Sequence, residues 1–182
     1  MPQRRTRALW ATTAAVLAVG LTTTSCSSQE KPKKREYAVP SSLCGTPVSP
    51  GALEPLLPGG DKLTSAKSGP LGFTLCHVMI DGKIAVTGIV EQRDSDTTLH
   101  DVAYGTYNLS AKSIRKELPD YVIAESSAVG HVPCRAMEKE GHAVFTMIRK
   151  EDGTVDTAAL QKAITEYTEA TSASKWCTRP SG

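Results

Sequence analysis

The chain has 182 residues, of which 40% are hydrophobic, 22% charged and 5% aromatic, with 14 glycines, 11 prolines and 5 cysteines. This composition excludes collagen-like, coiled-coil and wholly disordered proteins, and the length allows one domain or at most two small ones. The formal net charge is +2, but residues 1–36 hold seven of the basic and two of the acidic side chains, so 14 basic and 17 acidic groups remain. The part from Tyr37 onward is therefore net negative by about three charges, which gives a nucleic-acid partner no electrostatic support.

The N-terminus predicts an export signal. Arg4, Arg5 and Arg7 form a basic region, and fourteen uncharged residues follow at 8–21. A helix needs about 20 apolar residues to cross a bilayer, so this stretch is short for a permanent anchor and typical of a signal-peptide core. We therefore assign residues 1–25 to a signal peptide. The Arg4-Arg5 pair also resembles a twin-arginine signal, so both the general and the twin-arginine export routes stay open.

The predicted signal ends at Thr23-Thr24-Ser25-Cys26, where a small residue directly precedes a cysteine. The motif resembles a bacterial lipobox, although Thr23 stands where the usual motif has Leu, Val or Ile. The resemblance implies that Cys26 becomes the lipid anchor, carrying fatty acids such as palmitate. Two acyl chains give lasting attachment to a membrane. The alternative is an ordinary signal peptide cut nearby, with Cys26 left as a free thiol.

Residues 26–36 are predicted to be a disordered basic tether, because they are polar and lack apolar periodicity. Their basic side chains either rest on anionic lipid headgroups or remain solvated. Residues 37–182 are then expected to form a single domain.

The first half of this domain predicts a short helix and a β-hairpin. The helix covers residues 49–57, with Ser49 as its cap and Pro50 at its first position. Residues 62–72 are polar and punctuated by Gly and Pro, which indicates a connection. Residues 73–80 and 83–92 read as two strands joined by an Asp81-Gly82 turn.

The second half predicts further strands between two helices. Ser110 is expected to cap a helix that ends at Pro119, and residues 121–124 and 127–137 look extended. Residues 142–150 read as another strand. The clearest helix runs over 157–171 with Asp156 as its cap. Together these elements predict an α+β domain with an antiparallel sheet and helices packed on one face.

Four cysteines remain in the predicted domain: Cys44, Cys76, Cys134 and Cys177. An exported protein meets an oxidising compartment, so disulfides are favoured over a zinc site built on Cys76-His77 and His131-x-x-Cys134. Four cysteines allow three connectivities. A weak similarity between the segments that follow Cys76 and Cys134 indicates two similar hairpin and helix halves, and each cysteine would then take its own partner, Cys44 with Cys76 and Cys134 with Cys177.

The chain offers little for catalysis. It lacks a P-loop, a GxGxxG fingerprint, HExxH and GxSxG, and nothing in the spacing of His77, His100, His131 and His142 selects a catalytic set. We therefore assign no catalytic, metal-binding or ligand-binding residue and expect no cofactor. Tyr104 and Tyr107 are candidates to line a groove or to pack in the core.

The ordered features resemble a family. They are the lipobox-like signal, the basic tether, Leu43-Cys44-Gly45, the Leu56–Gly60 segment, Cys76 at a hairpin and a late helix that runs into Cys177. This order is similar to the small secreted lipoproteins of high-GC actinobacteria. The resemblance implies a disulfide-stapled domain on the extracytoplasmic face of the cell membrane, and it carries over no functional residue.

The function expected from these features is a non-enzymatic accessory module that binds a small ligand or an envelope protein. One alternative is a structural or sensory lipoprotein that contacts a membrane protein, which a large exposed apolar patch would favour. The other is an envelope hydrolase, which would need a cleft that gathers a histidine with Ser or Asp.

Overall fold

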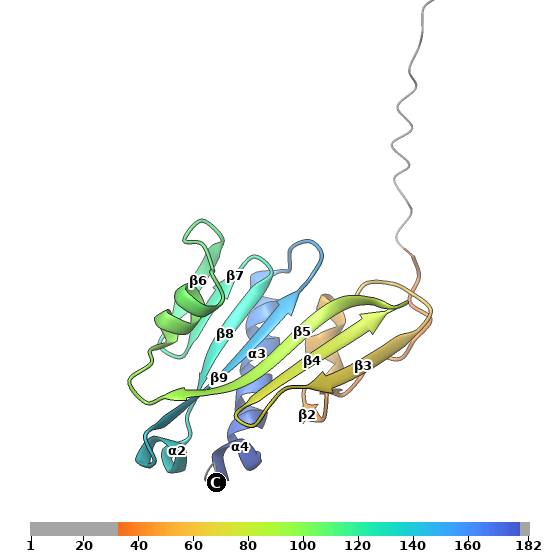
Figure 1. The fold of residues 1–182 in the computed structure, drawn as a ribbon. Coiled ribbons are helices and arrows are strands. Elements are labelled where there is room, and N and C mark those ends of the chain that lie inside the picture. The colour runs from red at the N-terminus through yellow and green to blue at the C-terminus, as the bar shows by residue number, and fades with distance from the viewer. Residues whose placement is uncertain (1–32, 179–182) are drawn as a thin grey trace, which may run out of the picture. The chain divides into compact units, whose positions relative to one another are not determined.

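The structure is a computed structural model that describes residues 33–178. Its centre is a seven-stranded antiparallel sheet in the order β3-β4-β5-β9-β8-β7-β6 (Figure 1). The strands are β3 (Leu63–Ser68), β4 (Phe73–Ile80), β5 (Lys83–Asp94), β6 (Ile114–Leu118), β7 (Tyr121–Ala124), β8 (Ser127–Val132) and β9 (His142–Lys150). A small second sheet pairs β1 (Ser42–Leu43) with β2 (Thr46–Pro47). The predicted α+β class with an antiparallel sheet is confirmed.

The predicted β4–β5 hairpin is confirmed together with its turn. Asp81 and Gly82 both have positive φ, 51° and 82°, as the tight two-residue turns of hairpins require. β5 then pairs with β9 over nine residues from Val86 to Asp94. These two long strands join the β3–β5 part of the sheet to the β6–β8 part.

The α-helices and one 3-10 turn cover one face of the sheet, which we call the back face. They are α1 (Pro50–Leu53), the 3-10 turn η1 (Glu54–Leu56), α2 (Arg135–Lys139), α3 (Thr157–Ser172) and α4 (Lys175–Thr178). α3 lies behind β8 and β9 in Figure 1. Its predicted cap is confirmed, since the Asp156 carboxylate accepts hydrogen bonds from the amides of Ala158 and Ala159 at 3.0 and 3.1 Å. Leu160, Ile164 and Tyr167 are almost fully buried against the sheet.

The opposite face of the sheet, the front face, carries a second apolar cluster. The π-helical segment η2 (Asp101–Thr106) and the residues after it supply Val102, Ala103 and Leu109 to this cluster. They pack on strand residues such as Phe145 and Met147, which are buried. The front side of β4 is less covered, since its side chains from Phe73 to Met79 on this face are only half-buried.

Both predicted disulfides are present. Cys44 pairs with Cys76, with their Cα atoms 5.7 Å apart, and Cys134 pairs with Cys177, with their Cα atoms 5.0 Å apart. The first fixes the segment before α1 to β4, and the second fixes α4 to the loop before α2. The zinc alternative therefore loses its thiolate ligands.

Three sequence predictions are wrong. Residues 114–118 form the edge strand β6 instead of a helix, and Leu63–Ser68 form the other edge strand instead of a connection. The segment predicted to be extended to Met137 leaves the sheet after Val132 and becomes α2. The element after Cys134 is thus a helix and the element after Cys76 is a strand, so the two halves are not alike although the disulfide pairing inferred from them is right.

The predicted signal peptide and the predicted anchor residue Cys26 lie outside the described residues. Among the helices between Lys33 and Thr178, none combines the length and the apolar character that crossing a bilayer requires.

Candidate functional site

A pocket of about 520 Å³ lies at the end of the sheet opposite to the β4–β5 turn. It is shallow and open to solvent. The β3–β4 loop forms one wall, the last residues of β5 form the floor, and the first residue of β9 closes the side. The lining residues are Pro70, Leu71, Gly72, Phe73, Glu91, Gln92, Arg93, Asp94 and His142.

Backbone geometry holds the β3–β4 loop over the pocket. Gly69 and Gly72 have φ values of 123° and 74°, which residues with a side chain rarely adopt. A Cβ atom on Gly69 would also lie 2.4 Å from the Phe73 carbonyl oxygen. The amide of Gln92 donates a 2.8 Å hydrogen bond to the carbonyl of Gly72 and so ties the loop to β5. As a result Leu71 projects into solvent and is 82% exposed, although it is a large apolar residue.

The floor of the pocket contains a buried carboxylate. Glu91 is only 2% exposed because its strand position points to the front face, in the same row as Phe73 and Phe145. Arg93 lies two residues along β5 on the same face, and its Nε donates a 2.8 Å hydrogen bond to Glu91 Oε2 while its Nη2 forms an ion pair at 2.5 Å. A buried charge of this kind needs a partner, and Arg93 supplies it.

Tyr107 completes the environment of Glu91. It follows η2, and its amide donates to the Val102 carbonyl at 3.0 Å, which closes the π-helical turn. Its hydroxyl donates a 2.7 Å hydrogen bond to Glu91 Oε1. Burial raises the pKa of Tyr107 far above its ordinary value, and the charge of Glu91 and this hydrogen bond raise it further. Tyr107 therefore stays protonated as a donor.

The arrangement is suited to recognition. Arg93 is held in place by Glu91 but keeps 39% of its side chain exposed, at the pocket surface. Arginine remains protonated and presents several donors to a carboxylate or phosphate group. Leu71 and Phe73 provide apolar surface on the opposite wall. The pocket thus fits a group that combines an apolar part with a hydrogen-bond acceptor.

A second, smaller pocket of about 400 Å³ lies between the β2–α1 segment and α3. Glu166 of α3 lines it and accepts hydrogen bonds from the amide and the hydroxyl of Ser49 at 2.7 and 3.0 Å. Ser49 therefore bonds to α3, and it makes no side-chain capping bond to α1, contrary to the sequence prediction. Because these groups already satisfy each other, this pocket is the weaker candidate.

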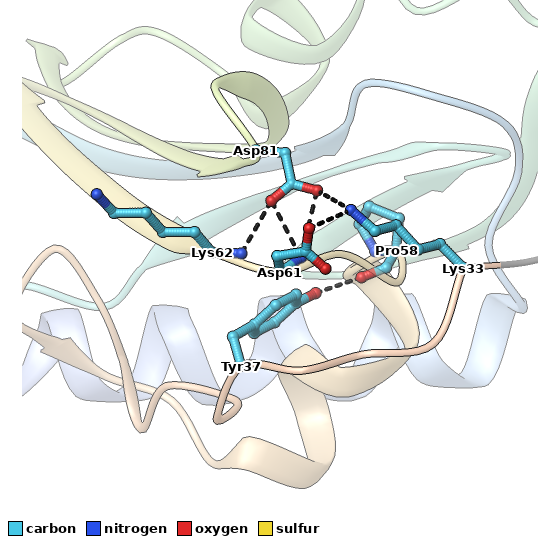
Figure 2. Close-up of polar contacts among 6 residues, drawn as sticks. All are labelled: Lys33, Tyr37, Pro58, Asp61, Lys62 and Asp81. Atoms are coloured by element: carbon cyan, nitrogen blue, oxygen red, sulfur yellow. Dashed lines mark hydrogen bonds and ion pairs between the residues drawn. The ribbon is translucent and has the colours of Figure 1, made fainter.

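The residues that precede Tyr37, the predicted start of the domain, contact the domain itself. We call this contact the N-terminal clamp; it joins Lys33–Tyr37 to Pro58–Lys62, Glu54 and Asp81. Figure 2 shows its charged centre, where Lys33 Nζ lies 2.7 Å from Asp61 and 2.8 Å from Asp81. The amides of Asp61 and Lys62 also donate to Asp81 (Figure 2). Residues 33–36, which the sequence assigns to a disordered tether, are thus bound to the domain.

Backbone and arginine contacts extend the clamp. The amide of Gly60 donates to the Lys34 carbonyl at 3.1 Å, and the amide of Glu36 donates to the Gly60 carbonyl at 2.8 Å. Arg35 pairs with Glu54 at 2.8 Å. A Cβ atom on Gly59 would lie 1.6 Å from the Lys33 carbonyl oxygen, so the close approach depends on glycine at this position.

Electrostatics hold both partners of the clamp in their charged forms. Hydrogen bonds to Asp61 and Asp81 raise the pKa of Lys33 above its ordinary value. The hydrogen bonds from Lys33 and from the amides of Lys62 and Asp61 lower the pKa of Asp81. The clamp is therefore charged on both sides at neutral pH.

The structure separates the four histidines. His77 lies in β4, His100 precedes η2, His131 lies in β8, and only His142 reaches the larger pocket. His131 is 3.9 Å from Asp120 and His100 is 3.7 Å from Glu117, on different elements. Within residues 33–178, His, Cys, Asp and Glu side chains do not gather in groups that could hold a metal ion.

Of the two tyrosines proposed to line a groove, Tyr107 lies beside the larger pocket through Glu91, whereas Tyr104 bonds to Glu117 instead. Glu91, Arg93 and Leu71 were not predicted from the sequence as site residues. The alternation along β5 could have identified Glu91. It is a charged residue at a position in step with the side chains that face the front of the sheet.

Comparison of the chain with family models, with curated proteins and with solved structures gives no match.

Proposed function

We propose that this protein is a lipoprotein of the extracytoplasmic face of the cell membrane, of the kind found in actinobacteria, and that it binds a small ligand or an envelope protein. The arrangement of the cysteines is the main support for this proposal. Of the five, four form two disulfides, which suit an oxidising compartment, and the fifth is Cys26 at the end of the signal-like segment. Acylation of Cys26 accounts for the unpaired cysteine.

The larger pocket supports a binding role. Glu91, Arg93 and Tyr107 form a pre-arranged polar floor, and Leu71 stands at the rim in an exposed position. Binding sites commonly combine apolar walls with a few fixed polar groups. We assign Leu71, Phe73 and Arg93 as the contact residues for the ligand.

The alternative, in which this protein contacts a membrane protein through one broad apolar surface, is less favoured. Among the described residues the exposed large hydrophobic side chains are Leu71 and Ile84, and they lie near opposite ends of β4. Two separated side chains do not make the contiguous apolar patch that such a surface usually shows. Hydrolysis also comes second. The larger pocket does bring His142 beside Asp94, its partner across β5 and β9, but the residues that line it include neither serine nor cysteine as a nucleophile.

The first test addresses the anchor. The full chain is expressed in a bacterial host that processes lipoproteins, with an alkyne-tagged fatty acid in the medium, and its intact mass is measured. We expect the tag on wild type and its loss in Cys26→Ser. An unmodified Cys26 in the processed wild-type protein would contradict the proposal.

The second test addresses the pocket. The acylated protein is screened against envelope extracts by native mass spectrometry and thermal shift, beside Leu71→Ser and Arg93→Gln. Leu71→Ser is the sharper variant because its side chain is mostly in solvent, so it should fold as wild type does. A ligand that binds wild type and both variants equally would place the binding site elsewhere.

A further inference from the structure

The N-terminal clamp shortens the connection between the anchor and the domain. Seven residue steps separate Cys26 from Lys33, and a fully extended chain spans at most about 3.5 Å per residue, so the connection reaches no more than about 25 Å. A tether that ran free to Tyr37 would reach about 40 Å by the same rule. Because the headgroup layer itself takes about 5–7 Å of this reach, Lys33 stays within about 20 Å of the bilayer surface.

The reach of the connection has different consequences for the two ends of the sheet. Lys33 bonds to Asp81 in the β4–β5 turn, whereas Phe73 at the other end of β4 lines the larger pocket. The eight residues of β4 rise about 3.3 Å each, so the two ends lie about 25 Å apart. If β4 stood along the membrane normal with the pocket against the bilayer, Lys33 would lie about 25 Å from the surface, which is farther than the connection allows.

The end of the domain beside the clamp carries groups suited to a membrane surface. Lys83 is exposed and begins β5, and Lys62 is exposed beside Asp81. Within the described part of the chain, neither ammonium group forms an ion pair. Ile84 follows Lys83 and is 38% exposed, in step with Met79 on the front face. An exposed apolar residue beside an exposed lysine is typical of surfaces that rest among anionic lipid headgroups.

We propose that the β4–β5 turn is a membrane-contact surface, in which Lys62, Lys83 and Ile84 rest on the headgroups of an anionic phospholipid bilayer. This inference rests on the proposed acylation of Cys26. The clamp then acts as a rigid junction, and the larger pocket faces away from the membrane. Ligands would reach the pocket from the outer side of the envelope.

Tryptophan quenching tests this orientation. Ile84→Trp and, as a matched control, Leu71→Trp are placed in a Trp176→Phe background of the full chain, since Trp176 is the tryptophan that remains after the signal. The acylated proteins are reconstituted in vesicles of phosphatidylglycerol and phosphatidylcholine that contain a lipid with a nitroxide on its headgroup. We expect a loss of fluorescence for Ile84→Trp and none for Leu71→Trp.

Three further variants separate the causes. Gly59→Ala should open the clamp and reduce the quenching of Ile84→Trp, while Gly105→Ala should leave it unchanged, because a Cβ atom there meets no neighbour within 4 Å. Lys62→Glu with Lys83→Glu should also reduce the quenching. Intact mass identifies which proposal fails. Protein that is acylated and vesicle-bound, yet shows equal quenching at both positions, overturns the orientation alone, and protein without acyl chains overturns both proposals.

Discussion

The hydroxyl of Tyr107 donates a 2.7 Å hydrogen bond to Glu91, sixteen residues earlier in the chain, and Glu91 is 2% exposed. The bond joins the segment after η2 to the central strand β5. It also supplies one of the two side-chain partners of a buried carboxylate, the other being Arg93. The floor of the larger pocket therefore depends on a contact between the sheet and the segment that covers its front face.

Replacing Tyr107 by Phe should destabilise the domain. The change removes a donor and leaves Glu91 Oε1 buried without this bond, which typically costs about 1–3 kcal/mol. Urea denaturation followed by circular dichroism measures the free energy of unfolding. Tyr104→Phe is the control, because Tyr104 bonds to the exposed side chain of Glu117 and its loss should change stability by less than about 0.5 kcal/mol. Equal effects of the two substitutions would contradict the role assigned to Tyr107.

High pH should destabilise the fold through its buried tyrosines. Burial raises the pKa of Tyr167 well above its ordinary value, as it does for Tyr107. A group whose pKa is raised on folding contributes its full stability below its unfolded pKa, about 10 for tyrosine, and loses it as the pH rises through the folded value. Each such group should lower the unfolding free energy by up to about 1.4 kcal/mol per pH unit above pH 10.

Thermal unfolding between neutral pH and pH 12 checks this expectation. Tyr167→Phe keeps the ring and removes the ionisable hydroxyl, so its stability should fall less steeply with pH than that of wild type. An identical pH dependence in both proteins would show that ionisation of Tyr167 does not limit the alkaline stability.

The sequence predicted the central elements because their signals are local. The alternation of residues 83–92, the Asp81-Gly82 turn and the Asp156 cap each specify one structure within a few residues. The edge strands were harder. Residues 114–118 place Ile114 and Leu118 on one side, which fits a helix turn and a strand equally, and pairing with β7 decides for the strand. β3 is mostly exposed, so it lacks the apolar alternation that marks a strand.

The candidate site could not be predicted because its contacts join distant parts of the chain. Arg93 is visible in the sequence, but its pairing with a buried Glu91 requires the front face to be covered by η2. Lys33 looks like part of a solvated basic run until Asp81 is placed beside it, 48 residues away. The disulfide pairing was predicted correctly from a similarity that holds only from the turn onward, since α2 replaces the expected strand before it.

Opening the N-terminal clamp should expose new cleavage sites. A methyl group on Gly59 would overlap the Lys33 carbonyl, so Gly59→Ala should release residues 33–36 without touching the sheet. Limited trypsin digestion followed by mass spectrometry should then give fragments that begin after Lys33, Lys34 or Arg35. Wild type and Gly105→Ala should resist cleavage there, because the backbone on both sides of Arg35 is hydrogen-bonded to Gly60. Rapid cleavage of wild type at these bonds would show that the clamp is open in solution.

The clamp should also have a defined pH range. The pKa of Asp81 is lowered chiefly by its hydrogen bond from Lys33, so the contribution of Asp81 is present above the ordinary carboxyl pKa of about 4 and is lost as the pH falls through the lowered value. The pKa of Lys33 is raised chiefly by its hydrogen bond to Asp61, so its contribution is present below about 10 and is lost as the pH rises through the raised value. The clamp is therefore expected to be closed over the whole physiological range.

Nuclear magnetic resonance can follow the acid side of this range. The amides of Asp61 and Lys62 donate to Asp81 at 3.0 and 2.9 Å, so their chemical shifts should report its titration. We expect a midpoint below the ordinary carboxyl pKa in wild type and a higher midpoint in Lys33→Ala, because the largest cause of the lowering is then removed. Lys67→Ala is the control, since Lys67 lies in β3 away from the clamp and should leave the midpoint unchanged. The same midpoint in wild type and Lys33→Ala would show that Lys33 does not hold Asp81 in solution, and that the segment before Tyr37 is not anchored by this pair.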